Sequence, residues 1–248
     1  MAQDGRGRQE RAVATRAALV EAAAAEFDER GYAGASMDGV AERAGMTKGA
    51  LYFHFRSKAD TARAVLEEQD AVSRRYAAAA AARVASPLES LMWMSQGLAT
   101  QMTDEVVVRA GVRLSSDPNA REIAREIARD HAAGDWASHT AEVIRRAIAA
   151  GEVDPSWDPE LVGRVVSPAF AGVQTASDVL HDRADLYERL QELWTVLLHA
   201  IGSERTRAEI PRLVAVIAPQ RVERDPTTDA TRVPPGTPTS LRHEDTKE

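Results

Sequence analysis

The feature that most constrains this chain is a broken helical run near its N-terminus, SMDGVAERAGMTKGALYFHFRSK, at residues 36–58. Ser36 and Thr47 are residue types that cap helix N-termini, because their hydroxyl oxygen accepts a hydrogen bond from a free backbone N–H. Gly45 lies between them and favours a chain reversal. The run therefore predicts two short helices joined by a tight turn.

The second of these helices has two distinct faces. Leu51 and Phe55 are four residues apart and form its buried face. The same geometry turns Lys48, Tyr52 and Phe53 outward. We therefore interpret Phe55 as a core residue and Tyr52 as a side chain that is free to contact a partner.

Apolar residues recur at three- and four-residue steps along most of the remaining chain, which is typical of amphipathic α-helices. One such stripe precedes Gly31, a natural helix end, and consists of Val13, Ala17, Val20, Ala24 and Phe27. Two longer apolar stripes occupy residues 158–179 and 183–203. The sequence lacks alternating strand patterns, so we predict an all-α fold.

Composition excludes several classes of function. The chain has no cysteine, which excludes disulfides, thiolate zinc sites and a cysteine nucleophile. It has no apolar run of about 18 residues and no apolar signal segment at its start, so we expect a cytoplasmic protein without membrane partners. No spacing suggests a nucleophile with its base, so we predict no catalytic residues, no cofactor and no enzyme activity.

Two short helices behind a longer one can place the second helix in the major groove of DNA. The net charge of −7 argues against a nucleic-acid partner, but residues 1–58 carry nine basic and eight acidic side chains. We expect Thr47, Lys48 and Gly49 to meet the groove. Tyr52, His54 and Lys58 are then placed to reach phosphate oxygens.

The segment GYAGASMDGVAERAGMTKGALYFHFRSKADTARAVL resembles the DNA-binding domain of the TetR family, over about residues 10–66. This resemblance implies an all-helical homodimeric repressor with an N-terminal three-helix DNA-binding domain and a C-terminal ligand-binding and dimerisation domain. Carried over by position, it implies that the DNA contacts are Ser36, Thr47, Lys48, Gly49, Tyr52, His54 and Lys58, with Arg11 and Thr15 as weaker candidates.

A narrower resemblance rests on TKGALYFHF, LEEQDAVSRR, LESLM and VVRAGVRL, which are similar to the γ-butyrolactone receptors of the same family. In that subfamily a glutamine, a tryptophan and a hydroxylic residue face the ligand. The resemblance implies Gln69, Trp136 and Ser167 for these roles, and beyond Leu114 the alignment needs an insertion. We add Phe170, beside Ser167, to the expected cavity.

Plainer interpretations stay open for several of these residues. Trp136 at helical spacing is also typical of a core residue, and an amide such as Gln69 is most often solvated. Trp194 is expected in the core or at a dimer interface. Trp93 and Gln96 lie one turn apart and could both face a cavity.

One histidine pattern remains to be interpreted. His131, Asp135 and His139 follow four-residue steps, so they could share one helix face with the spacing of metal ligands. The chain offers no supporting motif elsewhere, so we interpret them as a solvated polar face and predict no metal.

We predict four regions: a flexible basic arm at 1–9, a helix-turn-helix domain at 10–58, a helical ligand-binding and dimerisation domain at 59–218, and a disordered tail at 219–248. The expected partners are a pseudo-palindromic DNA operator, a small hydrophobic effector and a second copy of the chain. The resemblance to γ-butyrolactone receptors implies a γ-butyrolactone or furan-like signal that controls secondary metabolism. A response to an antibiotic-like molecule, an activator, a ligand-free DNA binder and a helical enzyme with a basic N-terminus are the alternatives.

Overall fold

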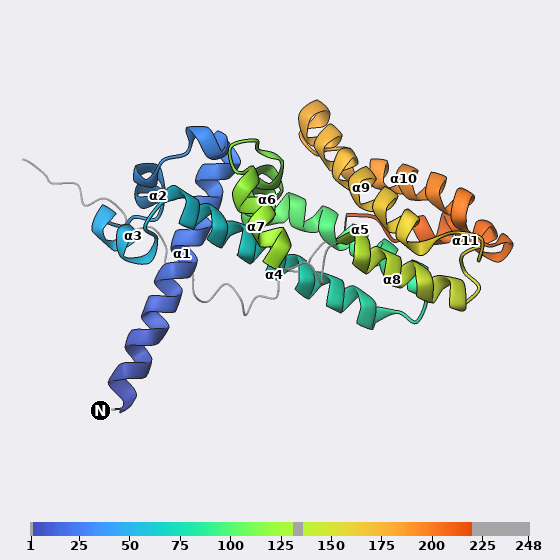
Figure 1. Ribbon diagram of the computed structural model, residues 1–248, viewed down its shortest axis with the longest axis horizontal. Coiled ribbons are helices and arrows are strands. Elements are labelled where there is room, and N and C mark those ends of the chain that lie inside the picture. The colour runs from blue at the N-terminus through green and yellow to red at the C-terminus, as the bar shows by residue number, and fades with distance from the viewer. Residues whose placement is uncertain (1, 131–135, 220–248) are drawn as a thin grey trace, which may run out of the picture.

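The computed structural model describes residues 2–130 and 136–219, and within these ranges the protein is built from helices (Figure 1). The all-α prediction is confirmed. In chain order the helices are α1 (Ala2–Gly34), α2 (Met37–Arg43), α3 (Lys48–His54), α4 (Lys58–Arg83), α5 (Pro87–Asp104), α6 (Val106–Ser116), α7 (Arg121–Asp130), α8 (Trp136–Ala149), α9 (Pro159–His181), α10 (Leu186–Ile201) and α11 (Glu204–Val214).

Two hydrophobic cores divide the molecule. The N-terminal core is formed by α1 to α4 together with α6 and α7, and contains Leu19, Phe27, Leu51 and Phe55 among its buried residues. The burial of Leu51 and Phe55 confirms the predicted inner face of α3. The recognition unit therefore rests on a core that α6, a helix about 50 residues further along the chain, helps to complete.

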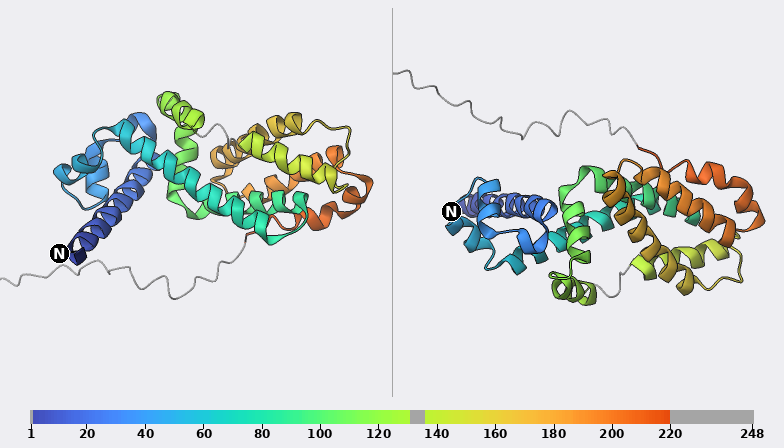
Figure 2. Two further views of the ribbon diagram at one scale, coloured as in Figure 1. Left: turned by 60° about the horizontal axis from the view of Figure 1, so that its bottom comes forward. Right: turned by 90° about the horizontal axis from the view of Figure 1, so that it is seen from above.

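The larger core lies among α5, α8, α9, α10 and α11, at the other end of the molecule (Figures 1 and 2). Trp194, Leu190 and Leu198 are buried there, so the core placement expected for Trp194 is confirmed. Helices α8 and α9 cross closely at Gly163, where an added Cβ would collide with the backbone carbonyl of Ala137. A glycine is therefore needed at this crossing.

The long helix α4 belongs to both cores. Its first half contributes Val65 and Leu66 to the N-terminal core, and its second half contributes Val72 and Ala77 to the larger one. The domain boundary expected between residues 58 and 59 lies at the start of α4, whereas the change from one core to the other occurs within that helix, after Leu66. The helix continues without a break from one domain into the other.

The N-terminal segment differs from the sequence interpretation. Residues 2–9, expected as a flexible arm, form the first turns of α1. Val13 and Ala17 are exposed although they continue the apolar stripe, because this part of α1 extends beyond the domain (Figure 1). The stripe meets the core only from Leu19 onward.

Some predictions fall outside the described residues. These are the tail from residue 220 onward and, in the histidine pattern, His131 and Asp135. Among the residues that the structure does describe, no helix is long and apolar enough to cross a membrane.

Candidate DNA interface and effector cavity

The turn between α2 and α3 forms as the sequence predicts. Ser36 Oγ accepts a hydrogen bond of 3.0 Å from Gly39 N, and Thr47 Oγ1 accepts one of 3.2 Å from Ala50 N. Gly45 adopts a φ of 62°, a left-handed conformation that favours glycine. Local capping and one glycine therefore set the angle between the two short helices.

The outer face of α3 is available to a partner. Tyr52 is 50 % exposed and Phe53 is 84 % exposed, and Lys48 is exposed as well. At Gly49 an added Cβ would approach only Thr47 Oγ1, at 3.9 Å. Nothing within the free protein requires a glycine at this position, which fits a surface that must allow another molecule to come close.

Lys48 is held by a neighbour on α2. Its Nζ lies 2.7 Å from Asp38 Oδ2, and both side chains are largely exposed. This hydrogen bond raises the pKa of Lys48. A DNA phosphate or base edge would have to compete with Asp38 for the ammonium group.

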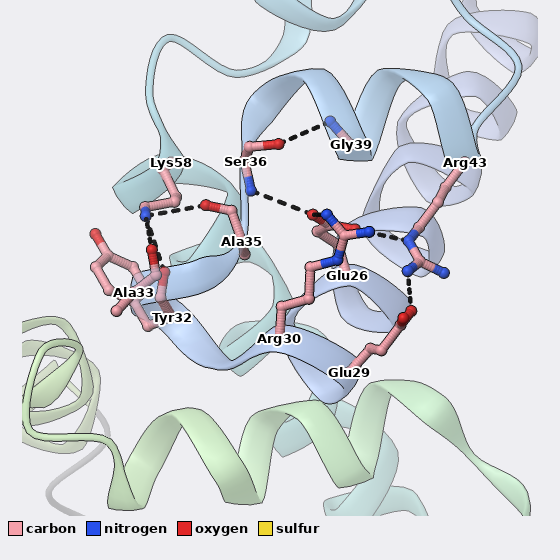
Figure 3. A network of polar contacts seen from close by, with 10 residues as sticks. All are labelled: Glu26, Glu29, Arg30, Tyr32, Ala33, Ala35, Ser36, Gly39, Arg43 and Lys58. Carbon is pink, nitrogen blue, oxygen red and sulfur yellow. Dashed lines mark hydrogen bonds and ion pairs between the residues drawn. The ribbon is translucent and has the colours of Figure 1, made fainter.

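Lys58 has a different environment from the one expected. Its Nζ donates to the backbone carbonyls of Tyr32, Ala33 and Ala35, at 2.8, 3.3 and 3.1 Å (Figure 3). The ammonium group also lies 4.8 Å from the centre of the Tyr32 ring. The three donors of Lys58 are thus directed at the C-terminal end of α1, where a cation is favourable, and we correct its assignment from a DNA contact to a structural one.

Sequence reasoning missed the polar centre of this domain. Glu26 is completely buried, and its carboxylate accepts hydrogen bonds from Arg43 Nε at 2.7 Å and from Ser36 N at 3.3 Å (Figure 3). Arg30 lies 3.4 Å away, and Gly39 leaves the room that the carboxylate occupies. A glutamate beside Phe27 on an apolar stripe was the available signal. The guanidinium group of Arg43 is therefore turned to Glu26 and Glu29.

The remaining expected DNA residues have varied surroundings. Ser36 is exposed beside its capping contact, and His54 is half-buried with its ring at the edge of Phe53. Thr15 is half-buried on α1, whereas Arg11 is exposed and its Nε donates to its own helix at Gly7 O. These side chains lie in the N-terminal domain, but only the outer face of α3 is open over its whole length.

A cavity of about 310 Å³ lies within the C-terminal domain. Four residues expected around an effector line it, Gln69 from α4, Trp136 from α8, and Ser167 and Phe170 from α9. Its other walls come mainly from α5, α6, α9 and α10 and are largely apolar, with Leu91, Met94, Ser95, Leu98, Val112, Val166 and Trp194 among them. The structure thus brings together residues that are about 100 positions apart in sequence.

Polar groups at one end of this cavity form a chain of hydrogen bonds. Gln69 Nε2 donates to Ser73 Oγ at 3.2 Å, and Ser73 Oγ donates to Gln101 Oε1 at the same distance. Gly111 on α6 allows Gln69 to pack closely, because an added Cβ would lie 2.5 Å from Gln69 Cγ. The amide of Gln69 is therefore oriented by neighbours rather than solvated.

Trp93 and Gln96 do not line the cavity, so their expected role is corrected. The guanidinium of Arg83 lies 3.8 Å from the centre of the Trp93 ring. Gln96 is buried and its Nε2 donates to Thr100 Oγ1 at 3.0 Å. The reason is the phase of α5, which turns other residues of that helix toward the cavity, namely Leu91, Met94, Ser95 and Leu98.

Helix α6 touches both the cavity and the DNA-binding domain. Val112 and Ser115 line the cavity. On another face of α6, Arg109 Nε lies 2.9 Å from Asp28 Oδ2 on α1. Just beyond the end of α6, Asp117 Oδ2 accepts a hydrogen bond of 3.0 Å from Tyr32 N. Polar contacts therefore join α1 to the same helix that lines the cavity.

His139 is the described member of the histidine pattern. It is half-buried with its ring against Trp136, and burial lowers its pKa. Among the described residues, no group of three or more histidine, aspartate or glutamate side chains could hold a metal ion.

A capped helix-turn-helix with an open outer face, linked by α4 and α6 to a domain with an apolar cavity, defines a DNA-binding transcriptional regulator. The sequence profile described as "Bacterial regulatory proteins, tetR family" matches residues 19–65, and the profile "Tetracyclin repressor-like, C-terminal domain" matches residues 85–202. The chain belongs to the TetR family. Its fold and relatives are those of regulators and not of enzymes.

Known relatives narrow the position within the family. The A-factor receptor protein of Streptomyces griseus is 34% identical over 213 residues, which cover 86% of this chain and 70% of that protein. A γ-butyrolactone receptor described as ArpA-like superposes with a TM-score of 0.70 at 31% identity, over 84% of this chain and 98% of the other. CprB from Streptomyces coelicolor, solved with its biological operator sequence, gives a TM-score of 0.68 at 31% identity, over 85% and 99% of the two chains.

Proposed function

We propose that this protein is a transcriptional repressor that binds a pseudo-palindromic operator as a dimer and is released by a small hydrophobic effector of the γ-butyrolactone type. The observation that carries the proposal is the cavity lined by Gln69, Trp136, Ser167 and Phe170. The relatives named as A-factor and γ-butyrolactone receptors support this class of effector. Secondary metabolism is the proposed target of regulation, and the cytoplasm is the proposed location because the operator is there.

The chemistry of the cavity suits a ligand with few polar atoms. Trp136 and Phe170 offer ring surface, whereas the Gln69 amide and the Ser167 hydroxyl offer hydrogen bonds. A buried amide left without its partner costs about 1–3 kcal/mol. A ligand that pairs with Gln69 is therefore favoured over an analogue without the matching oxygen.

DNA binding would use the outer face of α3. Thr47 and Gly49 allow close approach to the groove, and Tyr52 and Lys48 supply a hydroxyl and an ammonium group. In a dimer, the two recognition helices must match half-sites about one helical turn of DNA apart, or a multiple of it. An effector that favours another spacing weakens operator binding by linkage.

The proposed dimer surface consists of α9 and α10. Leu161 and Val165 on α9 and Val196 on α10 are exposed by 42, 50 and 69 %. Leu190 is completely buried in the same chain and so belongs to the core of one protomer. Val196→Glu is therefore the suitable test, and it should give monomers by light scattering, whereas an unchanged dimer mass would contradict the proposed surface.

Helix α6 offers a route from effector to DNA. It lines the cavity through Val112 and Ser115 and holds α1 through Arg109. An occupant that shifts α6 would shift α1 with it, and α1 carries the Glu26 contacts to α2.

The test is a mobility-shift assay with DNA from upstream of the protein's own gene. A γ-butyrolactone should release the wild-type protein. Trp136→Ala and Gln69→Ala should still bind DNA but should not be released. Release of both variants at the wild-type concentration would contradict the cavity assignment, and release only by antibiotic-like molecules would replace the proposed effector class.

A further inference from the structure

A second cavity of about 480 Å³ lies beside the first, between α6 and the C-terminal half of α9. The two cavities share Val112, Ser116 and Gln174 in their walls, so they adjoin. Phe170 in the first and Asp178 in the second lie on the same helix, about 12 Å apart along its axis at 1.5 Å per residue. An elongated molecule that occupied both cavities would pass along the side chains that they share.

The second cavity differs from the first in its charge. Three guanidinium groups line it, those of Arg109, Arg113 and Arg183, together with the carboxylates of Asp117 and Asp178. Two of these arginines have contacts with α1, because Arg109 pairs with Asp28 and Arg113 donates to the Asp28 carbonyl. Among the described residues, none of those that line the first cavity is charged.

The two carboxylates are already engaged by protein donors. Asp117 accepts hydrogen bonds from Asn119 N at 2.8 Å and from Tyr32 N at 3.0 Å. Asp178 Oδ1 lies 2.7 Å from a terminal nitrogen of Arg183. The two carboxylates therefore have fewer free lone pairs for hydrogen bonds from a ligand. Arg183, in contrast, keeps one N–H donor that is not used by the part of the protein that the structure describes.

Arg183 Nε is buried and has no hydrogen-bond partner within the described residues. A buried donor without an acceptor is costly, and an arginine next to a carboxylate oxygen forms a strong, charge-assisted hydrogen bond. Arg183 also has a φ of 64°, directly after Asp182 at 49°. Glycine is the usual residue at such a helix end, so an arginine is uncommon there, and its side chain lines the cavity.

We propose that the second cavity is a subsite for the carboxylate end of an elongated effector whose apolar part lies in the first cavity, and that Arg183 holds this carboxylate. The inference rests on the proposed function and extends it to the class of amphipathic carboxylic acids. A carboxylate here would also lie beside Arg109 and Arg113, the groups that fasten α6 to α1. Binding in this subsite would weaken that attachment by competing for the same guanidinium groups.

The experiment compares decanoate with γ-decalactone, two probes of equal carbon number that differ in charge. Their affinities for the full-length protein are measured at pH 7 by isothermal titration calorimetry. We expect decanoate to bind about tenfold more tightly, since a hydrogen bond to a charged group contributes about 1.5 kcal/mol or more. Arg183→Met should remove this advantage and leave the affinity for γ-decalactone unchanged.

Arg212→Met is the matched control, because Arg212 pairs with Glu89 and Glu209 on the surface of α5 and α11, away from both cavities. It should keep the preference for decanoate. Binding of the lactone with no advantage for the acid, or an acid preference that survives in Arg183→Met, would overturn the subsite alone. Binding of neither probe would overturn both the subsite and the proposed cavity.

Discussion

The two domains of this protein differ in how far their interiors are filled, and the difference suits their tasks. The N-terminal domain has a buried carboxylate, Glu26, and a capping ammonium, Lys58, that fasten α1 to α2 and α4 (Figure 3). The C-terminal domain packs apolar residues around Trp194 and also buries directional contacts, such as the hydrogen bond from Trp194 Nε1 to Ser95 Oγ, but it leaves a cavity. The N-terminal domain is filled around its buried carboxylate, whereas the C-terminal domain keeps space that another molecule could occupy.

The largest effect is expected at Glu26. Glu26→Ala leaves Ser36 N and Arg43 without their buried acceptor and should lower the free energy of unfolding by about 2–3 kcal/mol. Glu29→Ala is the control, because Glu29 also contacts Arg43 but is 60 % exposed, and it should cost less than about 1 kcal/mol. Urea denaturation measures both. Equal losses would mean that the buried carboxylate does not hold this domain together.

A second change probes the contact between α4 and α6. Gly111→Ala would place a Cβ 2.5 Å from Gln69 Cγ, so the helices must separate, at a cost of about 1–3 kcal/mol. Because Gln69 lines the cavity, effector affinity should fall while operator binding persists.

Gly49→Ala should give the opposite result to Gly111→Ala. Its Cβ meets nothing closer than 3.9 Å in the free protein, so thermal stability should not fall and only operator binding should weaken. Calorimetry and mobility shift distinguish the two variants. The distinction between the domains fails if both glycine variants lose the same property.

Two lysines test the structural correction in the N-terminal domain. Lys58→Met removes three hydrogen bonds to backbone carbonyls and should cost about 1–2 kcal/mol in stability. Lys48→Met should leave stability nearly unchanged and should reduce the dependence of DNA affinity on salt, by about one unit of slope if it contacts a phosphate. Denaturation and salt titrations measure these effects. A reduced salt slope for Lys58→Met alone would restore its original assignment as a DNA contact.

The smallest effect is expected from His139 in the C-terminal domain. Burial lowers its pKa in the folded state below the ordinary value of 6.5. As the pH falls through 6.5, the unfolded chain binds a proton before the folded chain does, so this residue makes stability decrease with decreasing pH. Unfolding of His139→Gln between pH 7 and 5 should show a weaker decrease than the wild type. An identical pH dependence would contradict the inferred burial effect.

The sequence predicted those features best that depend on interactions between residues close together in the chain. The caps at Ser36 and Thr47, the turn at Gly45 and the inner face of α3 depend on neighbours within a few residues, so their spacing predicted them. Family resemblance supplied Gln69, Trp136 and Ser167, and the structure brings them to one cavity together with Phe170, which was added as a neighbour of Ser167. The roles of these residues in binding DNA and effector stay predictions.

The surroundings of other residues depended on which helices pack against each other. Lys58 became a cap for α1 because α4 starts beside the end of that helix, and Trp93 turned away from the cavity because of the phase of α5. Spacing along one helix defines a face but not the neighbour that covers it. The sequence therefore determined the helices and the inner and outer faces of α3. Only tertiary packing decided the burial of Glu26, the unpartnered donor of Arg183 and the two adjoining cavities. Each of these depends on contacts between residues that are distant in the chain.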